Sequence, residues 1–264
     1  MTSPQPKITV YWLNESRADR IVWLLEELGL KYDLKLFSRT KEQLAPPEIE
    51  ELHPLGKVPL VQIEQEGKEP ICLVESGFIM QYLTDHFAPA AKPSLIPKKW
   101  KEGQENTVGG ETEQWMKYQH LMYYVEGSFM PSIVTGIILS MLKSPQVPFF
   151  IRPITGFVAN QILDGFLVPQ MDKHFDFLDS LLATSGGKYL VGDEVTTVDI
   201  LLSFPLGQQA MRNRLREEIA AGKKGQGIWE RHPKLLNYFE RIEKLEGFKR
   251  AEAKIKEAEA SQKK

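Results

Sequence analysis

Two short motifs in the first third of the chain have the chemistry to hold a small charged peptide in an extended form. Lys57 brings a cation, and the backbone of Val58-Pro59 beside it can pair with a peptide as an added strand does. Glu75-Ser76 comes sixteen residues after Pro59, directly before an apolar helical pattern. The free N–H groups at a helix N-terminus bind carboxylates, and a glutamate accepts hydrogen bonds from an ammonium group. Together the motifs indicate a site for a peptide with charged ends.

Four elements must position these motifs: a strand, a turn, a second strand and a helix. Residues 61–64 alternate between apolar and polar types, which predicts a strand with one buried face. Residues 66–68 are typical of a turn, and residues 71–74 predict a second, fully apolar strand. Apolar residues then recur at helical spacing as far as Leu83, so a helix is expected to begin at Ser76.

Two further strand patterns, upstream of these motifs, flank another helix. The strand patterns cover residues 8–13 and 32–37. The helix between them is predicted to begin at Ser16 and to stop at Gly29, since glycine commonly terminates a helix. A right-handed crossover through this helix makes the two strands parallel.

The pairing of Lys57-Val58-Pro59 with Glu75-Ser76 resembles the glutathione-binding signature of the cytosolic glutathione S-transferases. The similarity runs over about residues 7 to 250 and is greatest to the yeast-type fungal enzymes associated with the endoplasmic reticulum. The motifs that carry this closer similarity are Trp12-Leu13, Ser16-Arg17-Ala18, Ala45-Pro46-Pro47-Glu48, His53-Pro54-Leu55-Gly56 and Tyr123-Tyr124-Val125-Glu126-Gly127-Ser128.

The resemblance implies two domains of different architecture, as in the glutathione transferase fold. The first is an α/β thioredoxin-like domain of βαβ-ββα order over residues 1–88, and a proline-bearing linker follows over residues 89–112. An all-α helical domain over residues 113–250 would carry the site for the electrophile. The charged, alanine-rich residues 251–264 are expected to form a frayed helix or a disordered tail.

The resemblance also implies which part of glutathione each residue would meet. The backbone of Val58-Pro59, with a cis bond before the proline, would pair with the central cysteine of the tripeptide. Ser76 would bind the α-carboxylate of the γ-glutamyl end, and Glu75 would accept its ammonium group. Lys57 would meet the glycine carboxylate, and Arg39, after the second strand, is a further candidate for that end.

The thiol of glutathione must be activated, because the thiolate is the nucleophile. Lowering a thiol pKa from about 8.5 by about two units takes roughly 2.7 kcal/mol of preferential thiolate stabilisation. Ser16 would supply a hydroxyl at the junction of the first strand and helix, four residues before Arg20, as in serine-type glutathione transferases. Asn14 and Tyr11 are alternatives for the same role, and Ser16 would then be only a helix cap.

A second substrate is expected against the helical domain. Tyr118, Met122 and Tyr123 could line an apolar pocket, and Trp12 or Leu13 would close it from the other domain. Aromatic residues and methionine at helical spacing are more often core residues, so both interpretations stay open.

These residues predict a glutathione S-transferase that conjugates the glutathione thiolate to hydrophobic electrophiles, with glutathione-dependent peroxidase activity as a side reaction. The alternative is a glutathione-binding or regulatory protein of the same fold with weak or no catalysis. The resemblance implies a role in detoxification and a homodimer. Glutathione is the expected co-substrate, and no metal is expected.

Bulk properties limit the other function classes. A formal net charge of −2 over 264 residues gives no reason to expect a nucleic-acid partner. The single cysteine, Cys72, is expected to be buried in an apolar strand and fits a reducing compartment. The N-terminus lacks an apolar signal sequence, so a cytoplasmic protein is expected. The apolar residues 133–142 are about half of a membrane span, which leaves peripheral association with the endoplasmic reticulum as a minority alternative.

Overall fold

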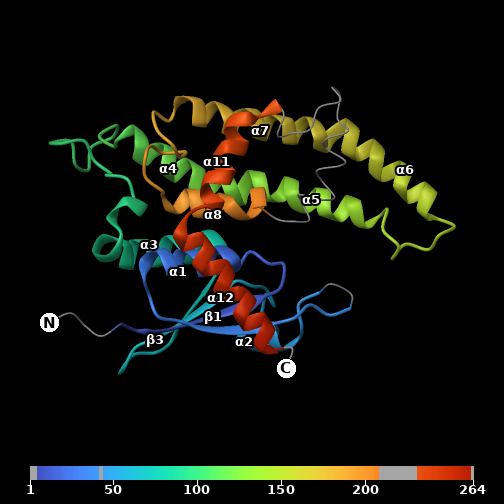
Figure 1. Cartoon of the computed structure of the whole chain (residues 1–264), viewed down its shortest axis with the longest axis horizontal. Helices are drawn as coiled ribbons and strands as arrows, with labels where there is room; N and C mark the ends of the chain where they lie inside the picture. The colour runs from blue at the N-terminus through green and yellow to red at the C-terminus, as the bar shows by residue number, and fades with distance from the viewer. Residues whose placement is uncertain (1–4, 42–43, 208–230, 263–264) are drawn as a thin grey trace. The chain divides into compact units, whose positions relative to one another are not determined.

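The computed structural model describes residues 5–41, 44–207 and 231–262 (Figure 1). The described residues form two compact units, each made from separate stretches of sequence. The first unit contains the described parts of Met1–Tyr118, Val195–Phe204 and Ile242–Lys264. The second contains the described parts of Gln119–Glu194 and Pro205–Arg241. The predicted domain ranges, which assumed continuous segments, stay predictions.

The first unit contains a four-stranded sheet. Its strands are β1 (Lys7–Leu13), β2 (Asp33–Phe37), β3 (Leu60–Glu64) and β4 (Ile71–Val74). Their order is β2-β1-β3-β4; β1 pairs in parallel with β2, and the other two pairs are antiparallel. Val61 and Ile63 are buried while Gln62 between them is partly exposed, as the alternation predicts. The predicted βαβ-ββα order and the parallel first pair are confirmed.

Within the described part of residues 5–95, three α-helices lie between or directly after the strands in sequence. They are α1 (Asp19–Leu28), α2 (Glu48–Leu52) and α3 (Ser76–Ala91), and a short 3₁₀ turn, η1 (Pro93–Leu95), follows the last. α1 ends at Gly29, whose φ of 63° lies in the left-handed region that glycine adopts readily. It begins at Asp19 and not at Ser16 as predicted, because residues 14–18 form turns after β1.

Cys72 is exposed, so the prediction of a buried thiol is wrong. Among the described residues β4 pairs with β3 alone, so it is an edge strand, and Ile71 beside Cys72 is 38% exposed. The apolar composition of this strand suggested burial on both faces, whereas an edge strand can leave one face open.

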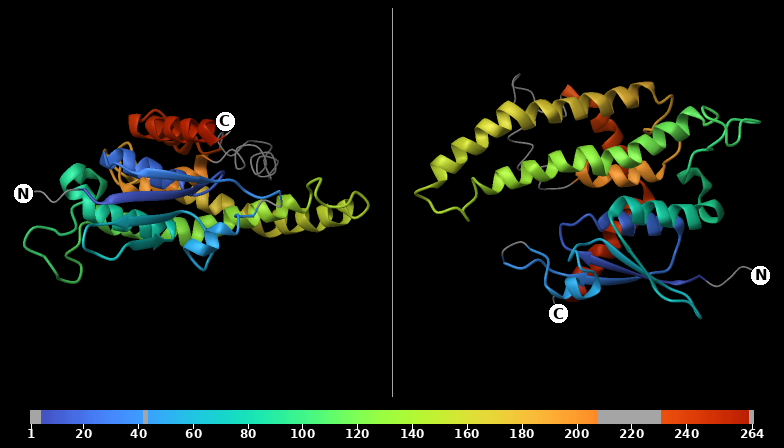
Figure 2. Two further views of the ribbon diagram at one scale, coloured as in Figure 1. Left: turned by 90° about the horizontal axis from the view of Figure 1, so that it is seen from below. Right: turned by 180° about the vertical axis from the view of Figure 1, so that it is seen from behind.

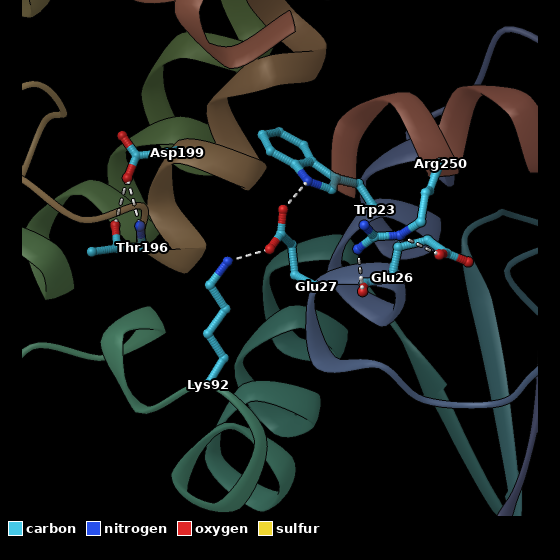
Figure 3. Close-up of polar contacts among 7 residues, drawn as sticks. All are labelled: Trp23, Glu26, Glu27, Lys92, Thr196, Asp199 and Arg250. Carbon is cyan, nitrogen blue, oxygen red and sulfur yellow. Dashed lines mark hydrogen bonds and ion pairs between the residues drawn. The ribbon is translucent and has the colours of Figure 1, made fainter. Parts of the chain in front are cut away.

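The C-terminal segment is helical in its described part, so of the two expectations, a frayed helix or a disordered tail, the disordered tail is wrong there. After α11 (Pro233–Glu243), α12 (Glu246–Gln262) lies along α1 (Figure 2). The ring of Phe248 packs edge-on against Trp23 with centroids 5.2 Å apart. Arg250 donates hydrogen bonds to the carboxylate and the carbonyl of Glu26 at 3.2 and 3.0 Å (Figure 3). Alanine, glutamate and lysine favour a helix, and the buried Ala251 lies on its inner face.

Two long helices among the described residues each contain one π-helical turn; the first enters the second unit after Tyr118, and the second lies wholly within it. The first comprises α4 (Glu113–Tyr124), η2 (Val125–Phe129) and α5 (Met130–Met141); the second comprises α6 (Arg152–Ile162), η3 (Leu163–Leu167) and α7 (Val168–Thr184). Phe129 packs edge-on against Phe175 with ring centroids 5.9 Å apart. Both side chains are buried and form part of the core of this unit.

The apolar residues 133–142 belong to a longer helix than the sequence suggested. α4, η2 and α5 together cover Glu113–Met141, a length of 29 residues whose most apolar window has a mean hydropathy of 1.2 and is 39% buried. Among the described residues, it is the one helix long and apolar enough to cross a bilayer. Length and composition alone are weak evidence for a span, because core helices of soluble proteins meet the same criterion.

The spacing of Thr196 and Asp199 predicts a capping box at a buried helix start, and this is confirmed. α8 (Thr197–Gly207) begins there. The backbone N–H and the hydroxyl of Thr196 both donate to Oδ2 of Asp199, at 2.8 and 2.9 Å (Figure 3). Both side chains are buried, so the carboxylate is satisfied locally by the backbone and side chain that it caps.

If α12 is a packed part of the first unit, a charge on its inner face must destabilise the protein. We expect Ala251→Glu to lower the free energy of unfolding by about 1–3 kcal/mol, because it forces a larger, charged side chain into a 3% exposed position. The matched control is Ala253→Glu, on the exposed face of the same helix, which should change stability by less than about 0.5 kcal/mol. Urea unfolding followed by circular dichroism measures both. Equal effects of the two substitutions contradict the packing.

Candidate functional site

A surface recess in the first unit brings most of the predicted peptide-binding residues together. It has an empty volume of about 390 Å³, including space open to solvent. Its walls are formed by Arg17, His53, Leu55, Lys57, Val58, Pro59, Val74, Glu75 and Ser76. Five of the six residues predicted to bind glutathione are among them; Arg39 is not.

The backbone of Val58 is available for pairing. The bond between Val58 and Pro59 is cis, as the resemblance implied, and β3 begins one residue after the proline. Within the described residues, neither the N–H nor the C=O of Val58 has a hydrogen-bond partner. Val58 is only partly buried, so an extended peptide in the recess can supply both missing bonds.

The N-terminus of α3 forms another part of the recess wall. Ser76 is the first helical residue and is 3% exposed, and Glu75 before it occupies the N-cap position without a side-chain cap hydrogen bond. The first N–H groups of a helix have no intrahelical partner and carry the positive end of its dipole. A carboxylate in the recess can therefore accept hydrogen bonds from this helix end.

Glu75 has an unusual backbone conformation. Its φ of 69° and ψ of 120° place a residue that carries a Cβ in a region that L-amino acids rarely adopt. Such strain is of order 1–3 kcal/mol and persists where the surrounding structure imposes it, often at functional sites. Here it occurs at the residue that joins β4 to α3, and the Glu75 side chain is exposed in the recess.

The charges of the recess are mixed. Arg17 and Lys57 bring two cations, and Glu75 brings one carboxylate. This set matches a ligand with two carboxylates and one ammonium group. The sequence placed Arg17 in a motif but gave it no role, so this contribution was missed. The Nδ1 atom of His53, a loop residue, accepts a hydrogen bond from the Leu55 N–H at 3.3 Å.

Ser16 adjoins Arg17 of the recess wall and is 5% exposed. Its Oγ accepts a hydrogen bond from the Ala18 N–H at 3.2 Å. In the described part of the chain, no acceptor takes the proton of this hydroxyl. The hydroxyl can therefore donate to a thiolate, and the bond that it accepts polarises it in the favourable direction.

The two alternatives to Ser16 are engaged in other contacts. Oδ1 of Asn14 accepts a hydrogen bond from the Arg39 N–H at 2.8 Å, which leaves only its amide nitrogen as a donor. The hydroxyl of Tyr11 donates to Oε1 of Gln62 at 2.8 Å, and the ring is 3% exposed. Ser16, Asn14 and Tyr11 are alike in that none of them is among the residues that line the recess. The choice among the three stays a prediction, and the contacts favour Ser16.

Arg39 has a structural role in the described contacts. Its guanidinium donates to the carbonyls of Asn14 and Glu15, each at 3.1 Å, so it joins the loop after β2 to the loop after β1. Its position outside the recess differs from the expected contact with the glycine carboxylate.

Most residues predicted to line the electrophile pocket are packed. Trp12, Leu13, Tyr118 and Met122 are between 2% and 6% exposed, whereas Tyr123 is 70% exposed. Burial also raises the pKa of Tyr118 to about 12. The four buried residues are therefore packed as core residues are. The electrophile pocket stays a prediction.

Asp19, which directly follows the turn that carries Ser16 and Arg17, has a carboxyl group whose pKa is raised by burial. Burial raises the pKa of Asp19 from 3.8 to about 6, against the lowering effect of a hydrogen bond from the Trp12 indole, whose Nε1 donates at 2.6 Å. Glu259 and Glu252 of α12 raise the pKa further, and Arg20 lowers it. The sequence did not single out Asp19, and the two α12 carboxylates that raise its pKa lie more than two hundred residues away.

Comparison with known proteins gives a consistent result. Family models for the N-terminal and the C-terminal domain of glutathione S-transferase match residues 6–85 and 158–254. The chain is 34% identical over 203 residues to glutathione S-transferase 1 of Saccharomyces cerevisiae, covering 76% of this chain and 80% of that protein. It is 31% identical over 199 residues to glutathione S-transferase 3 of Schizosaccharomyces pombe, covering 75% and 73%.

A solved structure shares the fold. The glutathione transferase homolog from Lodderomyces elongisporus, crystallised with two GSH per subunit, is 19% identical. The similarity covers 93% of this chain and 97% of that chain with a TM-score of 0.64. The predicted fold class, a thioredoxin-like domain with helices of the glutathione transferase type, is confirmed.

The backbone strain at Glu75 should be measurable as a difference in the free energy of unfolding between two variants. Glu75→Gly should have a free energy of unfolding about 1 kcal/mol above that of Glu75→Ala, because glycine tolerates positive φ and alanine does not. Both substitutions remove the same carboxylate, so the difference in stability between the two variants reports the cost of the backbone conformation. Urea unfolding measures the difference. If the two variants are equally stable, the conformation is not strained.

Asp19 should make stability depend on pH. The folded-state pKa of about 6 lies above the unfolded value, so the folded protein binds the proton more tightly. The stabilisation that this tighter proton binding gives the folded state is fully present below about pH 4 and is lost as the pH rises through about 6. Asp19→Asn, which keeps an acceptor for Trp12, should be more stable than the wild type by at most about 3 kcal/mol at pH 7 and by little at pH 4.

The control for this prediction is Asp33→Asn, at an exposed position in β2. It should change the free energy of unfolding by less than about 0.5 kcal/mol at either pH. Urea unfolding at both pH values compares the variants. A gain for Asp19→Asn that is the same at pH 4 and pH 7 contradicts the raised pKa.

Proposed function

Because the chain belongs to the glutathione S-transferase family, we propose that it binds glutathione in the recess and transfers the glutathione thiolate to apolar electrophiles. Glutathione has two carboxylates, one ammonium group and a thiol between its ends. The observation that carries the proposal is the composition of the recess, which combines Arg17, Lys57, Glu75 and the uncapped N-terminus of α3.

Each end of glutathione has a matching partner in this proposal. The α-carboxylate of the γ-glutamyl end accepts hydrogen bonds from the first N–H groups of α3 and from the Ser76 hydroxyl. The adjacent ammonium donates to the Glu75 carboxylate. The cysteinyl backbone pairs with the unpartnered N–H and C=O of Val58, and Lys57 meets the glycine carboxylate.

Ser16 is the proposed activator of the thiol. Its hydroxyl donates a hydrogen bond to the sulfur and stabilises the thiolate over the thiol. A hydrogen bond to a charged group contributes about 1.5–3 kcal/mol, which is close to the roughly 2.7 kcal/mol needed to lower the thiol pKa by two units. The same thiolate could attack a hydroperoxide, which is why peroxidase activity is proposed as a side reaction.

The relatives support glutathione as the co-substrate. The proteins from the two yeasts are named glutathione S-transferases, and the Lodderomyces elongisporus structure contains glutathione. We extend glutathione binding to this chain because five of the six predicted contact residues meet in one recess. A homodimer, a role in detoxification and a cytoplasmic location belong to the same proposal.

Titration of bound glutathione tests the role of Ser16. In the wild type, the ultraviolet absorbance of the thiolate should titrate about two pH units below the free thiol, whose pKa is about 8.5. Ser16→Ala should raise the pKa of the bound thiol towards that value and lower turnover about a hundredfold, because it removes roughly 2.7 kcal/mol. Ser180→Ala, an exposed serine on α7, is the matched control and should leave both unchanged.

Two results would contradict this proposal in different ways. A bound thiol pKa near 8.5 in the wild type, with protein retained on glutathione resin and no turnover of electrophiles or peroxides, identifies a binding or regulatory protein. A lowered pKa that survives in Ser16→Ala assigns activation to Asn14 or to backbone N–H groups.

A further inference from the structure

The turn between β1 and α1 is held by the chain segment that follows β2. The Asn14 N–H donates to the Phe37 carbonyl at 3.4 Å, and the Arg39 N–H donates to Oδ1 of Asn14 at 2.8 Å. The Arg39 guanidinium then donates from Nε to the Asn14 carbonyl and from Nη2 to the Glu15 carbonyl, each at 3.1 Å. Residues 14 and 15 are therefore attached to residues 37–39 by both backbone and side-chain hydrogen bonds.

The two guanidinium bonds fix the backbone of Glu15. A peptide unit is planar, so the direction of a carbonyl fixes the plane of the whole unit. The Asn14 carbonyl belongs to the unit before Glu15, and the Glu15 carbonyl belongs to the unit that ends at the N–H of Ser16. The guanidinium is also planar and presents its donors in a rigid fork. Because both carbonyls are held in this fork, Arg39 sets φ and ψ of Glu15 and, through them, the position of Ser16.

The conformation that is held in this way is an unfavourable one. Glu15 has a φ of 53°, in the left-handed region that glycine adopts readily and that residues with a Cβ rarely adopt. Its side chain is exposed, so packing of that side chain does not impose the conformation. Strained backbone persists where the surrounding structure imposes it, and the guanidinium of Arg39 is in place to do so.

The chain beyond Ser16 is fixed independently of Arg39. The Ala18 carbonyl accepts hydrogen bonds from the N–H groups of Ile21 and Val22 at 2.9 and 3.2 Å, which joins it to the first turn of α1. The Ala18 N–H donates to Oγ of Ser16 at 3.2 Å. A change of backbone at residue 15 must therefore be absorbed between β1 and Ala18, in the short stretch that carries the Ser16 hydroxyl.

We propose that Arg39 is a positioning residue for activation of the thiol. The guanidinium holds the backbone of Glu15 at positive φ, and Ser16 after it is thereby presented to the sulfur. This role rests on the proposed function, in which the Ser16 hydroxyl stabilises the thiolate. It differs from the contact with the glycine carboxylate that was expected of Arg39, which is not among the residues that line the recess.

A positioning role affects the thiol pKa and turnover and leaves the binding of glutathione intact. Misplacing a reacting group by about 1 Å can lower a rate by about a hundredfold. Arg39→Met keeps a long side chain but no donor, so it should raise the pKa of the bound thiol by about one unit or more and lower kcat about tenfold or more. The dissociation constant of glutathione should change by less than about threefold, because the residues of the recess are untouched.

Three measurements on the full chain test this role: ultraviolet titration of bound glutathione, calorimetric titration with glutathione, and steady-state kinetics. The matched control is Arg152→Met, which removes another guanidinium that donates to backbone carbonyls, those of Pro145 and Val147. This control should leave the thiol pKa and kcat unchanged. Circular dichroism and thermal melting establish that each variant is folded, and Arg39→Lys carries the test if Arg39→Met is not.

Two further variants separate position from charge. Arg39→Lys keeps the cation but not the planar fork, so it should raise the thiol pKa in the same direction as Arg39→Met does. Glu15→Gly in the Arg39→Met background should restore at least about half of the lost pKa shift, because glycine adopts positive φ without strain.

The results that contradict this role differ from those that contradict the proposed function. A bound thiol pKa near 8.5 in the wild type overturns the proposed function and the role of Arg39 with it. When the wild-type pKa is lowered, an unchanged pKa in Arg39→Met overturns the positioning role alone. Glutathione affinity that falls about tenfold without a change in pKa assigns Arg39 to the glycine carboxylate and also overturns it. A pKa that rises in Arg39→Met but not in Arg39→Lys, or that Glu15→Gly does not restore, means that the charge acts on the thiol directly, which overturns positioning.

Discussion

A buried guanidinium is the constraint on which the first unit depends. Arg20, in the first turn of α1, is 1% exposed, and its Nη1 donates to the Leu201 carbonyl of α8 at 2.8 Å. The guanidinium carbon also lies 5.3 Å from the centre of the Phe204 ring. A buried charge is tolerated only when it is paired or hydrogen-bonded, so Arg20 fixes the start of α1 against α8. α8 is itself fixed at its start by the capping box of Thr196 and Asp199.

Further polar contacts hold the rest of α1 (Figure 3). Glu27 accepts a hydrogen bond from the Trp23 indole at 2.9 Å and pairs with Lys92 after α3, while Glu26 binds Arg250 of α12. The helix is thus held at both ends by elements distant in sequence. The consequence for the site is positional, because the turn that carries Ser16 and Arg17 leads directly into this fixed helix. A hydroxyl that must meet a thiolate within hydrogen-bond distance needs such support.

Local patterns in the sequence predicted much of the fold and of the site. The four strands follow from alternation and apolar runs, Gly29 from its role as a helix stop, and the capping box from the spacing of Thr196 and Asp199. The five predicted residues that meet in the recess are held by β3, β4 and α3, which lie close together in sequence. What the sequence could not predict depends on distant partners. The raised pKa of Asp19 depends partly on carboxylates of α12, the exposure of Cys72 depends on the strand order, and the helix from Glu246 to Gln262 packs on α1.

We propose that the recess at the N-terminus of α3 binds glutathione by both of its ends, and a crystal structure of the protein with glutathione would test this. We expect the γ-glutamyl carboxylate within hydrogen-bond distance of the Ser76 N–H and hydroxyl, its ammonium at Glu75, and the cysteinyl backbone paired with Val58. Glutathione bound outside the recess, or bound in it with its two ends reversed, would show that these residues do not bind it in this way.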